Sequence, residues 1–413
     1  MKKTAVCLLL VCSTLCKFVE AQQLHHSDIR VSLLTAAPGE EIYAVFGHSA
    51  IRIKIEKLGH DAVYNYGTFS FNQPNFVANF ARGKMLYYLS VSSFDSFMAS
   101  YMYENRKMRE QVFDLDSVQT IFMVEFLQNN YNHDPYYLYH FFLDNCATRI
   151  RDLLITFDDN EKLDGYRYYF REDSATRNNS VRAILKSKSF PQSQDNPTFR
   201  ALIHSYLGQH HWGRFGIDIG LGLPTDQKTG IFEQMFLPDY LFDAFAKVMH
   251  NGAPVVKETK TIFTPDPNRP AAILPPSPVT PTVVCSLILT LAVIFLFVRK
   301  AARIFDFTLF FATGLTGLLI TFLWFFTEHT FTQNNLNIIW ALPTHVVMAF
   351  LLLPKRGKGN KFVRQYFLAT AVVAMLLLLT WAFLPQRLNP ALIPLVLAIS
   401  IRAFRNSKKI RVN

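Results

Sequence analysis

The sequence has 413 residues, half of them hydrophobic, and a formal net charge of +11. The charge is unevenly distributed: residues 22–281 carry 25 basic and 28 acidic side chains, whereas residues 282–413 carry 14 basic and 2 acidic ones. Because the basic excess lies wholly in the apolar C-terminal part, the soluble part lacks the charge of a nucleic-acid-binding protein, and we expect no nucleic-acid partner.

Residues 1–21 are typical of a secretory signal peptide. Two lysines precede an apolar run from Ala5 to Cys16, and Ala21 fits a small-residue cleavage site. Cleavage there leaves two of the five cysteines, Cys146 and Cys285. Exported proteins usually use cysteine in disulfides. The alternatives for Cys146 are therefore a disulfide with Cys285, an inert core position, or chemistry.

A single globular domain is expected over residues 22–251. Residues 42–55 end in an alternation of apolar and polar side chains, which indicates a half-buried strand. Residues 62–71 are rich in aromatic and β-branched side chains and indicate a second strand. Residues 57–61 are expected to form the turn of the resulting β-hairpin. A helix is expected over residues 119–131.

An amphipathic helix is expected to begin at Cys146. The apolar residues that recur behind it at three- and four-residue steps are Ala147, Ile150, Leu153, Leu154 and Phe157. Asp144 and Asn145 are residue types that cap a helix start, which places Cys146 in the first turn, where free backbone N–H groups favour an anion. Such a setting lowers the pKa of a thiol and so favours the reactive thiolate.

A nucleophilic cysteine needs a base and a residue that orients the base. His48 is the candidate base, because Gly47 before it allows close approach and the residues after it are small. The candidates for the orienting residue are Asp61, Asn65 and Tyr66. The competing histidines are His60, expected in the hairpin turn, His133, His140, His204, His210 and His211.

Two later stretches are expected to lack regular structure. Residues 213–240 carry five glycines without the spacing of a phosphate-binding loop, and we interpret them as loop scaffolding. Residues 252–281 hold eight of the twenty prolines and are expected to form an extended linker. The sequence shows no metal-ligand motif, so no metal is expected, and no nucleotide cofactor is implied.

Residues 282–413 are expected to form a membrane domain. It contains five apolar runs, each near the roughly 20 residues that span a bilayer. The runs are 282–298, 307–326, 337–354, 363–384 and 388–404. Basic residues gather in alternate loops, which the positive-inside rule places in the cytoplasm together with the C-terminus. The same rule places the N-terminal domain outside, as the signal peptide does.

The outer loop between the second and third runs is polar without being basic. Polar groups at the membrane surface need partners, so His329, Asn335 and Asn337 are candidates for substrate contact on the membrane side. The alternative is ordinary loop polarity.

Several segments carry a resemblance to known families. The order His48, Asn65, Asn145-Cys146 resembles circularly permuted papain-like enzymes such as the lecithin–retinol acyltransferase-like group. A closer resemblance, to the Lnb family of lipoprotein N-acyltransferases of Bacteroides-type bacteria, rests on FGHSAIRI, VYNYGTFSF, NFARGKMLYYL, DNCATRIRDLL, GIDIGLG, FLPDYL and the loop HTFTQNNLNIIW. It implies an α+β fold, with a circularly permuted papain-like cysteine-histidine domain followed by an all-α membrane domain of about five helices.

The resemblance also implies a reaction. An acyl chain moves from a phospholipid, through a thioester on Cys146, to the α-amine of a diacylated lipoprotein at the inner membrane. Cys146, His48 and Asn65 are then catalytic, and Asn145, Ala147 and Tyr66 position groups or leave room for the oxyanion. Two alternatives remain: a membrane-anchored cysteine peptidase or amidase acting on cell-wall peptide, and a non-catalytic envelope module that needs neither Cys146 nor His48.

Overall fold

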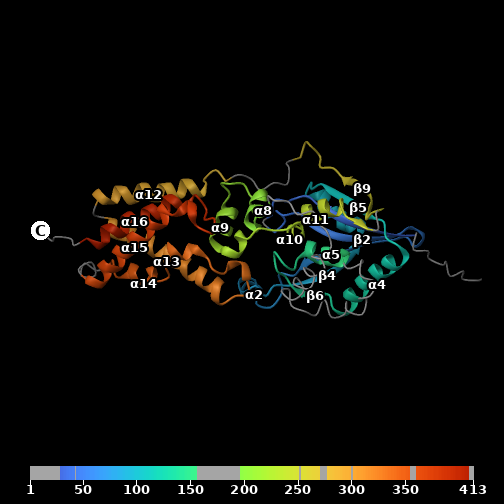
Figure 1. Cartoon of the computed structure of the whole chain (residues 1–413), viewed down its shortest axis with the longest axis horizontal. Coiled ribbons are helices and arrows are strands. Elements are labelled where there is room, and N and C mark those ends of the chain that lie inside the picture. Colours follow the sequence, from blue (N-terminus) through green and yellow to red (C-terminus); the bar gives the residue numbers. More distant parts are fainter. Residues whose placement is uncertain are drawn as a thin grey trace, which may run out of the picture.

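The computed structural model describes residues 28–41, 43–155, 196–250, 253–269, 277–298, 301–353 and 360–408. The expected signal peptide lies outside the described residues. The molecule is elongated, with a β-sheet at one end and a helical region at the other (Figure 1). The N-terminal part is therefore mixed α and β and the C-terminal part helical, as expected at this level.

One sheet of seven strands organises the N-terminal part, in the order β6-β4-β3-β2-β1-β5-β9. Every neighbouring pair is antiparallel. The strands are β1 (Ile29–Ala36), β2 (His48–Ile55), β3 (His60–Phe69), β4 (Leu86–Ser93), β5 (Met108–Phe113), β6 (Tyr136–Leu138) and β9 (Val256–Phe263).

The expected hairpin is formed by β2 and β3, in which Ile51 lies opposite Tyr64 and Ile55 opposite His60. Its turn is shorter than expected, because a single 3-10 turn (η2, Glu56–Leu58) and Gly59, at φ 61°, reverse the chain. His60 therefore begins β3, and its expected position in the turn was wrong. The strand expected over residues 42–55 is also shorter than expected, because β2 begins only at His48.

Helices cover both faces of the sheet. The helices α4 (Ser117–His133), α5 (Cys146–Ile155) and α11 (Pro238–Phe245) bury one face, where Leu33 and Ile51 lie. The helix α3 (Phe94–Tyr103) packs against the other face, where Val63 lies. Alternation of side chains along each strand supplies both apolar surfaces. The expected helix over residues 119–131 is α4, which begins at a capping box.

Residues 213–240 are helical rather than loop scaffolding. They form most of α9 (Trp212–Gly220), then η5 (Leu223–Asp226), α10 (Ile231–Gln234) and the start of α11. One glycine here serves close packing: a Cβ on Gly222 would lie 1.8 Å from the carbonyl oxygen of Gln333. At Gly222 the absence of a side chain thus permits tight contact between two chain segments. The helix α8 (Phe199–Tyr206) precedes this stretch.

The expected linker contains a strand of the main sheet. After a two-stranded hairpin of β7 (Met249–His250) and β8 (Ala253–Pro254), β9 pairs with β5 along the sheet edge. The prediction of an extended linker over residues 252–281 is thus wrong for residues 256–263. These eight residues contain no proline, so their backbone N–H groups can pair with a neighbouring strand.

The C-terminal part contains α12 (Pro281–Phe297), α13 (Ala302–Phe325), α14 (His345–Phe350), α15 (Lys361–Leu379) and α16 (Leu392–Ser407). Among the described residues, α13 and α15 are long and apolar enough to cross a membrane, by length and composition only. The third expected run is broken, because η7 (Leu336–Ile339) and α14 are separated by a turn that includes Pro343. The number of membrane crossings therefore remains a prediction.

Candidate active site

Cys146 is the first residue of α5, as expected. The side-chain oxygen of Asn145 accepts hydrogen bonds from the backbone N–H groups of Ala147 and Thr148, both at 2.9 Å. Behind Cys146, the apolar face of the helix is fully buried at Ala147 and Ile150. Asn145 therefore positions the start of α5, which is one of the two roles expected for it.

The amide nitrogen of Asn145 holds two further chain segments. It donates to the backbone oxygens of Phe141, at 2.8 Å, and Phe236, at 2.9 Å. An Asn145→Ala substitution removes the cap and leaves buried carbonyl groups without their donor. We expect it to lower the free energy of unfolding in detergent by about 2 kcal/mol. Asn145→Asp keeps the accepting oxygen, so its free energy of unfolding should lie between those of the parent and of Asn145→Ala. An Asn145→Ala protein as stable as the parent would contradict this role.

His48 lies where β2 extends beyond its partner β3. The pairing with β3 begins only at Ile51, whereas the pairing with β1 continues to His48. The stretch His48–Ala50 thus pairs with β1 on one side and with no described strand on the other side, where α5 begins. Gly47 before it has φ 80°, and a Cβ there would lie 2.7 Å from the backbone oxygen of Ala36. The chain can enter β2 in this way because residue 47 is glycine.

Of the three candidates for orienting His48, Asn65 makes the contact. Its side-chain oxygen lies 2.8 Å from Nε2 of His48. Asp61 instead pairs with Arg52 at 2.6 Å, and the Tyr66 hydroxyl donates to Asn130 at 2.7 Å. Tyr66 is 1% exposed within the core, so the positioning role expected for it at the site was wrong.

The two reactive groups shift each other's protonation. Burial raises the pKa of the Cys146 thiol, but the charge of His48 and hydrogen bonds from His48 and from the backbone N–H groups of Ser49 and Ala147 bring it below its ordinary value. Burial lowers the pKa of His48, but the charge of Cys146 and hydrogen bonds to Cys146 and Asn65 bring it above its ordinary value. Each group thus favours the charged form of the other, the thiolate of Cys146 and the imidazolium of His48.

This pairing predicts how alkylation of Cys146 depends on pH. The rate with iodoacetamide should stay high below the usual thiol pKa of about 8.5 and fall only as the pH drops through the lowered pKa of Cys146. His48→Ala removes the counter-charge, so its titration midpoint should move upward. Mass spectrometry of the peptide that contains Cys146 measures both profiles. A parent midpoint near the ordinary thiol value would show that no ion pair forms.

Two contacts of the pair were missed from the sequence. The backbone N–H of Ser49 reaches the sulfur of Cys146, and Gly67 packs against the imidazole of His48. A Cβ on Gly67 would lie 2.2 Å from Cε1 of His48. A glycine inside a strand often marks such a close approach, and this was the available signal.

The other reactive residues have separate environments. Cys146 and Cys285 are both free thiols, so the disulfide alternative is not realised. Nε2 of His140 lies 3.1 Å from the Thr330 hydroxyl, and Nε2 of His204 lies 2.8 Å from Asp218.

Two family models match this chain. Residues 17–181 match the Lnb N-terminal periplasmic domain and residues 274–411 the Lnb transmembrane domain. The chain belongs to the Lnb family. It is thus a membrane protein with a periplasmic N-terminal part, and its family is consistent with an enzyme of lipoprotein modification in the envelope. No curated protein and no solved structure matches it.

In this Lnb protein the outer loop joins the two parts of the molecule. Asn335 and Asn337 are both 0% exposed. The amide nitrogen of Asn335 donates to the backbone oxygen of Ile219 at 2.7 Å, and that of Asn337 to the backbone oxygen of Asp218 at 3.0 Å. Both amides are thus occupied by α9, and the prediction that they contact substrate was wrong.

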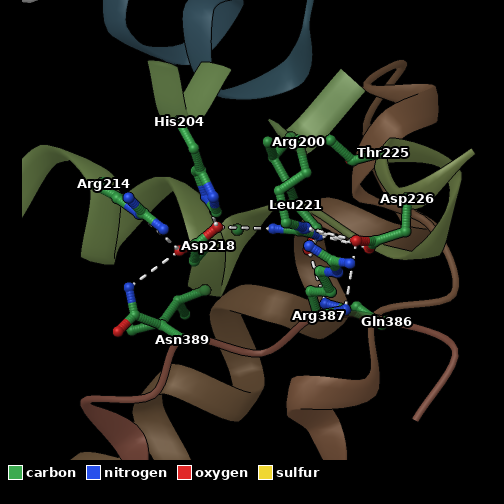
Figure 2. A network of polar contacts seen from close by, with 12 residues as sticks. Arg200, His204, Arg214, Asp218, Leu221, Thr225, Asp226, Gln386, Arg387 and Asn389 are labelled. Atoms are coloured by element: carbon green, nitrogen blue, oxygen red, sulfur yellow. Dashed lines mark hydrogen bonds and ion pairs between the residues drawn. The ribbon is translucent and has the colours of Figure 1, made fainter. Parts of the chain in front are cut away.

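A buried ion cluster lies at the same junction (Figure 2). Asp218 accepts from Arg200 at 2.9 Å and from the membrane-domain residue Asn389 at 2.9 Å, while Arg200 also pairs with Asp226 at 3.0 Å. Arg200 and Asp218 are each 1% exposed. These buried contacts hold the periplasmic part of the Lnb chain against its membrane part, and the guanidinium of Arg200 binds both carboxylates.

Proposed function

We propose that this Lnb protein is a lipoprotein N-acyltransferase with a cysteine nucleophile. The observation that carries the proposal is the site itself: Cys146 at a helix start, within hydrogen-bond reach of His48, which Asn65 holds at 2.8 Å. The donor is a membrane phospholipid and the acceptor a diacylated lipoprotein. The protein is then a multi-pass protein of the bacterial inner membrane with a cytoplasmic C-terminus.

The order of the catalytic elements supports a circularly permuted papain-like fold for the periplasmic part. The histidine stands on β2, the orienting Asn65 on the adjacent β3, and the cysteine at the start of the later helix α5. Because Asn65 contacts Nε2 of His48, the nitrogen left for the sulfur of Cys146 is Nδ1. This arrangement leaves one ring nitrogen for orientation and one for proton transfer.

In the first step the thiolate of Cys146 attacks the carbonyl carbon of a phospholipid ester. A C–S bond forms, the ester C–O bond breaks, and the imidazolium of His48 gives its proton to the departing lysophospholipid oxygen. The oxyanion is placed beside the sulfur, toward which the backbone N–H of Ser49 points, together with that of Ala147, which the Asn145 oxygen shares. Elsewhere one such donor contributes about 10²–10³ in rate.

In the second step the neutral α-amine of the lipoprotein's N-terminal cysteine attacks the thioester carbon. His48 takes a proton from the amine, the C–S bond breaks, and the thiolate of Cys146 is restored together with an amide. No further energy source is needed because the ester already supplies the acyl group in activated form.

The membrane domain explains how such substrates are reached. Drawing an acyl chain into water costs about 0.8 kcal/mol per CH₂. The described contacts of the outer loop with α9 hold the periplasmic part against the membrane part. An acyl chain therefore passes between bilayer and site without crossing bulk water.

The test is the intact mass of the full-length protein in detergent after mixing with one defined phospholipid. We expect an added acyl mass on Cys146, absent from Cys146→Ala and His48→Ala, which a synthetic diacylated lipopeptide removes with formation of triacylated peptide. Loss of the acyl mass to water alone would indicate a hydrolase. An alkylatable protein that is never acylated, but cleaves cell-wall peptide, would establish the peptidase or amidase instead.

A role as a non-catalytic envelope module is tested in cells. Lipoproteins in a strain whose only copy is Cys146→Ala should lack the third acyl chain. Unchanged acylation in that strain would overturn the enzyme proposal.

A further inference from the structure

The short helix α2 (Phe76–Arg82) presents apolar side chains to the outside. Val77 is 76% exposed and Phe80 61%, and Phe71 just before the helix is 68% exposed. No residue of α2 is buried. Large exposed apolar side chains this near one another in the sequence favour a contact with a protein or a membrane.

The helix α2 is attached to the outer end of the membrane domain. The backbone N–H of Glu328 donates to the oxygen of Arg82 at 2.9 Å, and Nε2 of His329 lies 3.1 Å from the oxygen of Phe80. Lys84 pairs with Glu328 at 3.1 Å. Figure 1 shows α2 beside the end of α13. The helix is thus held on the loop that leaves the membrane.

The distance from α2 to the apolar layer is short. The last residue of α13 and its neighbour, Phe325 and Phe326, are 65% and 68% exposed, as expected for aromatic side chains at the bilayer boundary. His329 follows Phe326 by three residues, and three residues extend over about 10 Å at most. The exposed side of α2 is therefore close enough to the end of α13 to reach the lipid headgroups when α13 crosses the bilayer.

A row of aromatic rings leads from α2 toward the nucleophile. Ring centroids lie 4.8 Å apart between Phe71 and Phe69, 4.9 Å between Phe69 and Tyr87, and 4.2 Å between Tyr87 and Tyr139. Tyr87, Tyr139 and Cys146 all pack against the same core. Burial, and then the nearby charge of Cys146, raise the pKa of Tyr87 to about 12. The row thus ends close to the sulfur.

We propose that α2 lies in the outer leaflet of the membrane, with Val77 and Phe80 among the lipids, and that the aromatic row from Phe71 to Tyr139 guides a phospholipid acyl chain to Cys146. The occupant of this surface is the phospholipid bilayer. Its apolar side chains match the acyl region, and the exposed Arg82 at the end of α2 matches the phosphate groups. The fate of the chain at Cys146 rests on the proposed function; the insertion of α2 does not.

Photocrosslinking tests the insertion without catalysis. The full chain with Cys146→Ala carries benzoylphenylalanine in place of Val77 and is reconstituted in nanodiscs of phosphatidylethanolamine and phosphatidylglycerol. Val118, 60% exposed on α4 at the far end of the molecule, provides the matched control position (Figure 1). We expect irradiation to add a phospholipid mass at position 77 and not at 118. Equal labelling at both, or labelling at Phe325 without any at 77, would overturn the proposal.

A second measurement tests the path. The double variant Val77→Asp, Phe80→Asp should be acylated by bilayer phospholipid about tenfold more slowly than the parent, because two apolar contacts with lipid are lost. Its acylation by a water-soluble short-chain nitrophenyl ester should be unchanged, as should both rates of Val118→Asp. An equal loss with both donors would overturn the path. A parent that no phospholipid acylates would instead remove the proposed function, while the crosslink at position 77 remains informative.

Discussion

Replacing Gly67 by alanine is expected to slow acylation of Cys146 by about 10²-fold while the protein remains folded. The new Cβ would occupy the place of the His48 ring, 2.2 Å from Cε1. The backbone of Gly67 has no left-handed conformation that would itself exclude alanine. The ring must therefore rotate or shift away from Asn65, and the proton transfer between His48 and Cys146 loses its alignment.

A rate alone would not separate this displacement from a general loss of structure. Gly208→Ala is the matched control, because no atom lies within 4 Å of a Cβ at that position. We expect Gly208→Ala to behave as the parent. In Gly67→Ala the midpoint of the alkylation profile should rise toward the ordinary thiol pKa, because the counter-charge has moved. A Gly67→Ala protein with the parent's rate and profile would show that His48 tolerates the methyl group.

Arg200→Met is expected to lower the free energy of unfolding by about 3–5 kcal/mol, the usual cost of breaking a buried ion pair by removing one partner. Arg200 is 1% exposed and binds Asp218 and Asp226 at 2.9 and 3.0 Å. Its loss leaves two buried carboxylates without their shared cation. Denaturant unfolding in detergent, followed by tryptophan fluorescence, measures the change.

The comparison variant is Arg109→Met. Arg109 pairs with Asp239, but their side chains are 23% and 31% exposed. An ion pair in contact with water contributes about 0–1 kcal/mol, so this variant should remain close to the parent. An equal loss of free energy of unfolding in both variants would show that the buried ion pairs of Arg200 stabilise the protein no more than the partly exposed pair of Arg109.

The parts of the fold that were predicted from sequence depend on neighbours along the chain. The alternation in residues 51–55 and the cap at Asn145 are local patterns, and both produced the expected elements. Cys146 was placed correctly because a helix start is defined by the two residues before it. His48 followed from its strand and from the glycine before it, whereas the choice of Asn65 over Asp61 and Tyr66 rested on the family resemblance.

The parts that were missed depend on contacts between distant segments. The strand β9 pairs with β5, more than 140 residues earlier in the chain. The prolines on both sides of β9 led to the prediction of a linker there. Asn335 and Asn337 bind backbone atoms 116 and 119 residues away. Asn65 and Tyr66 are adjacent, so they face opposite sides of β3, and only the packing of β2 and α5 decides which side holds the site.

The buried ion cluster of Figure 2 also has a consequence for how a substrate's concentration should be expressed. Because buried ion pairs and amides fix the periplasmic part on the membrane part, Cys146 stays at one height above the bilayer. The lipid-anchored substrate of the proposed acyltransferase would then arrive by lateral diffusion in the leaflet. Its encounter with the site depends on its mole fraction among the lipids. Under the proposed function, diluting the vesicles should leave turnover per copy unchanged, whereas adding inert phospholipid to the same leaflet should lower it.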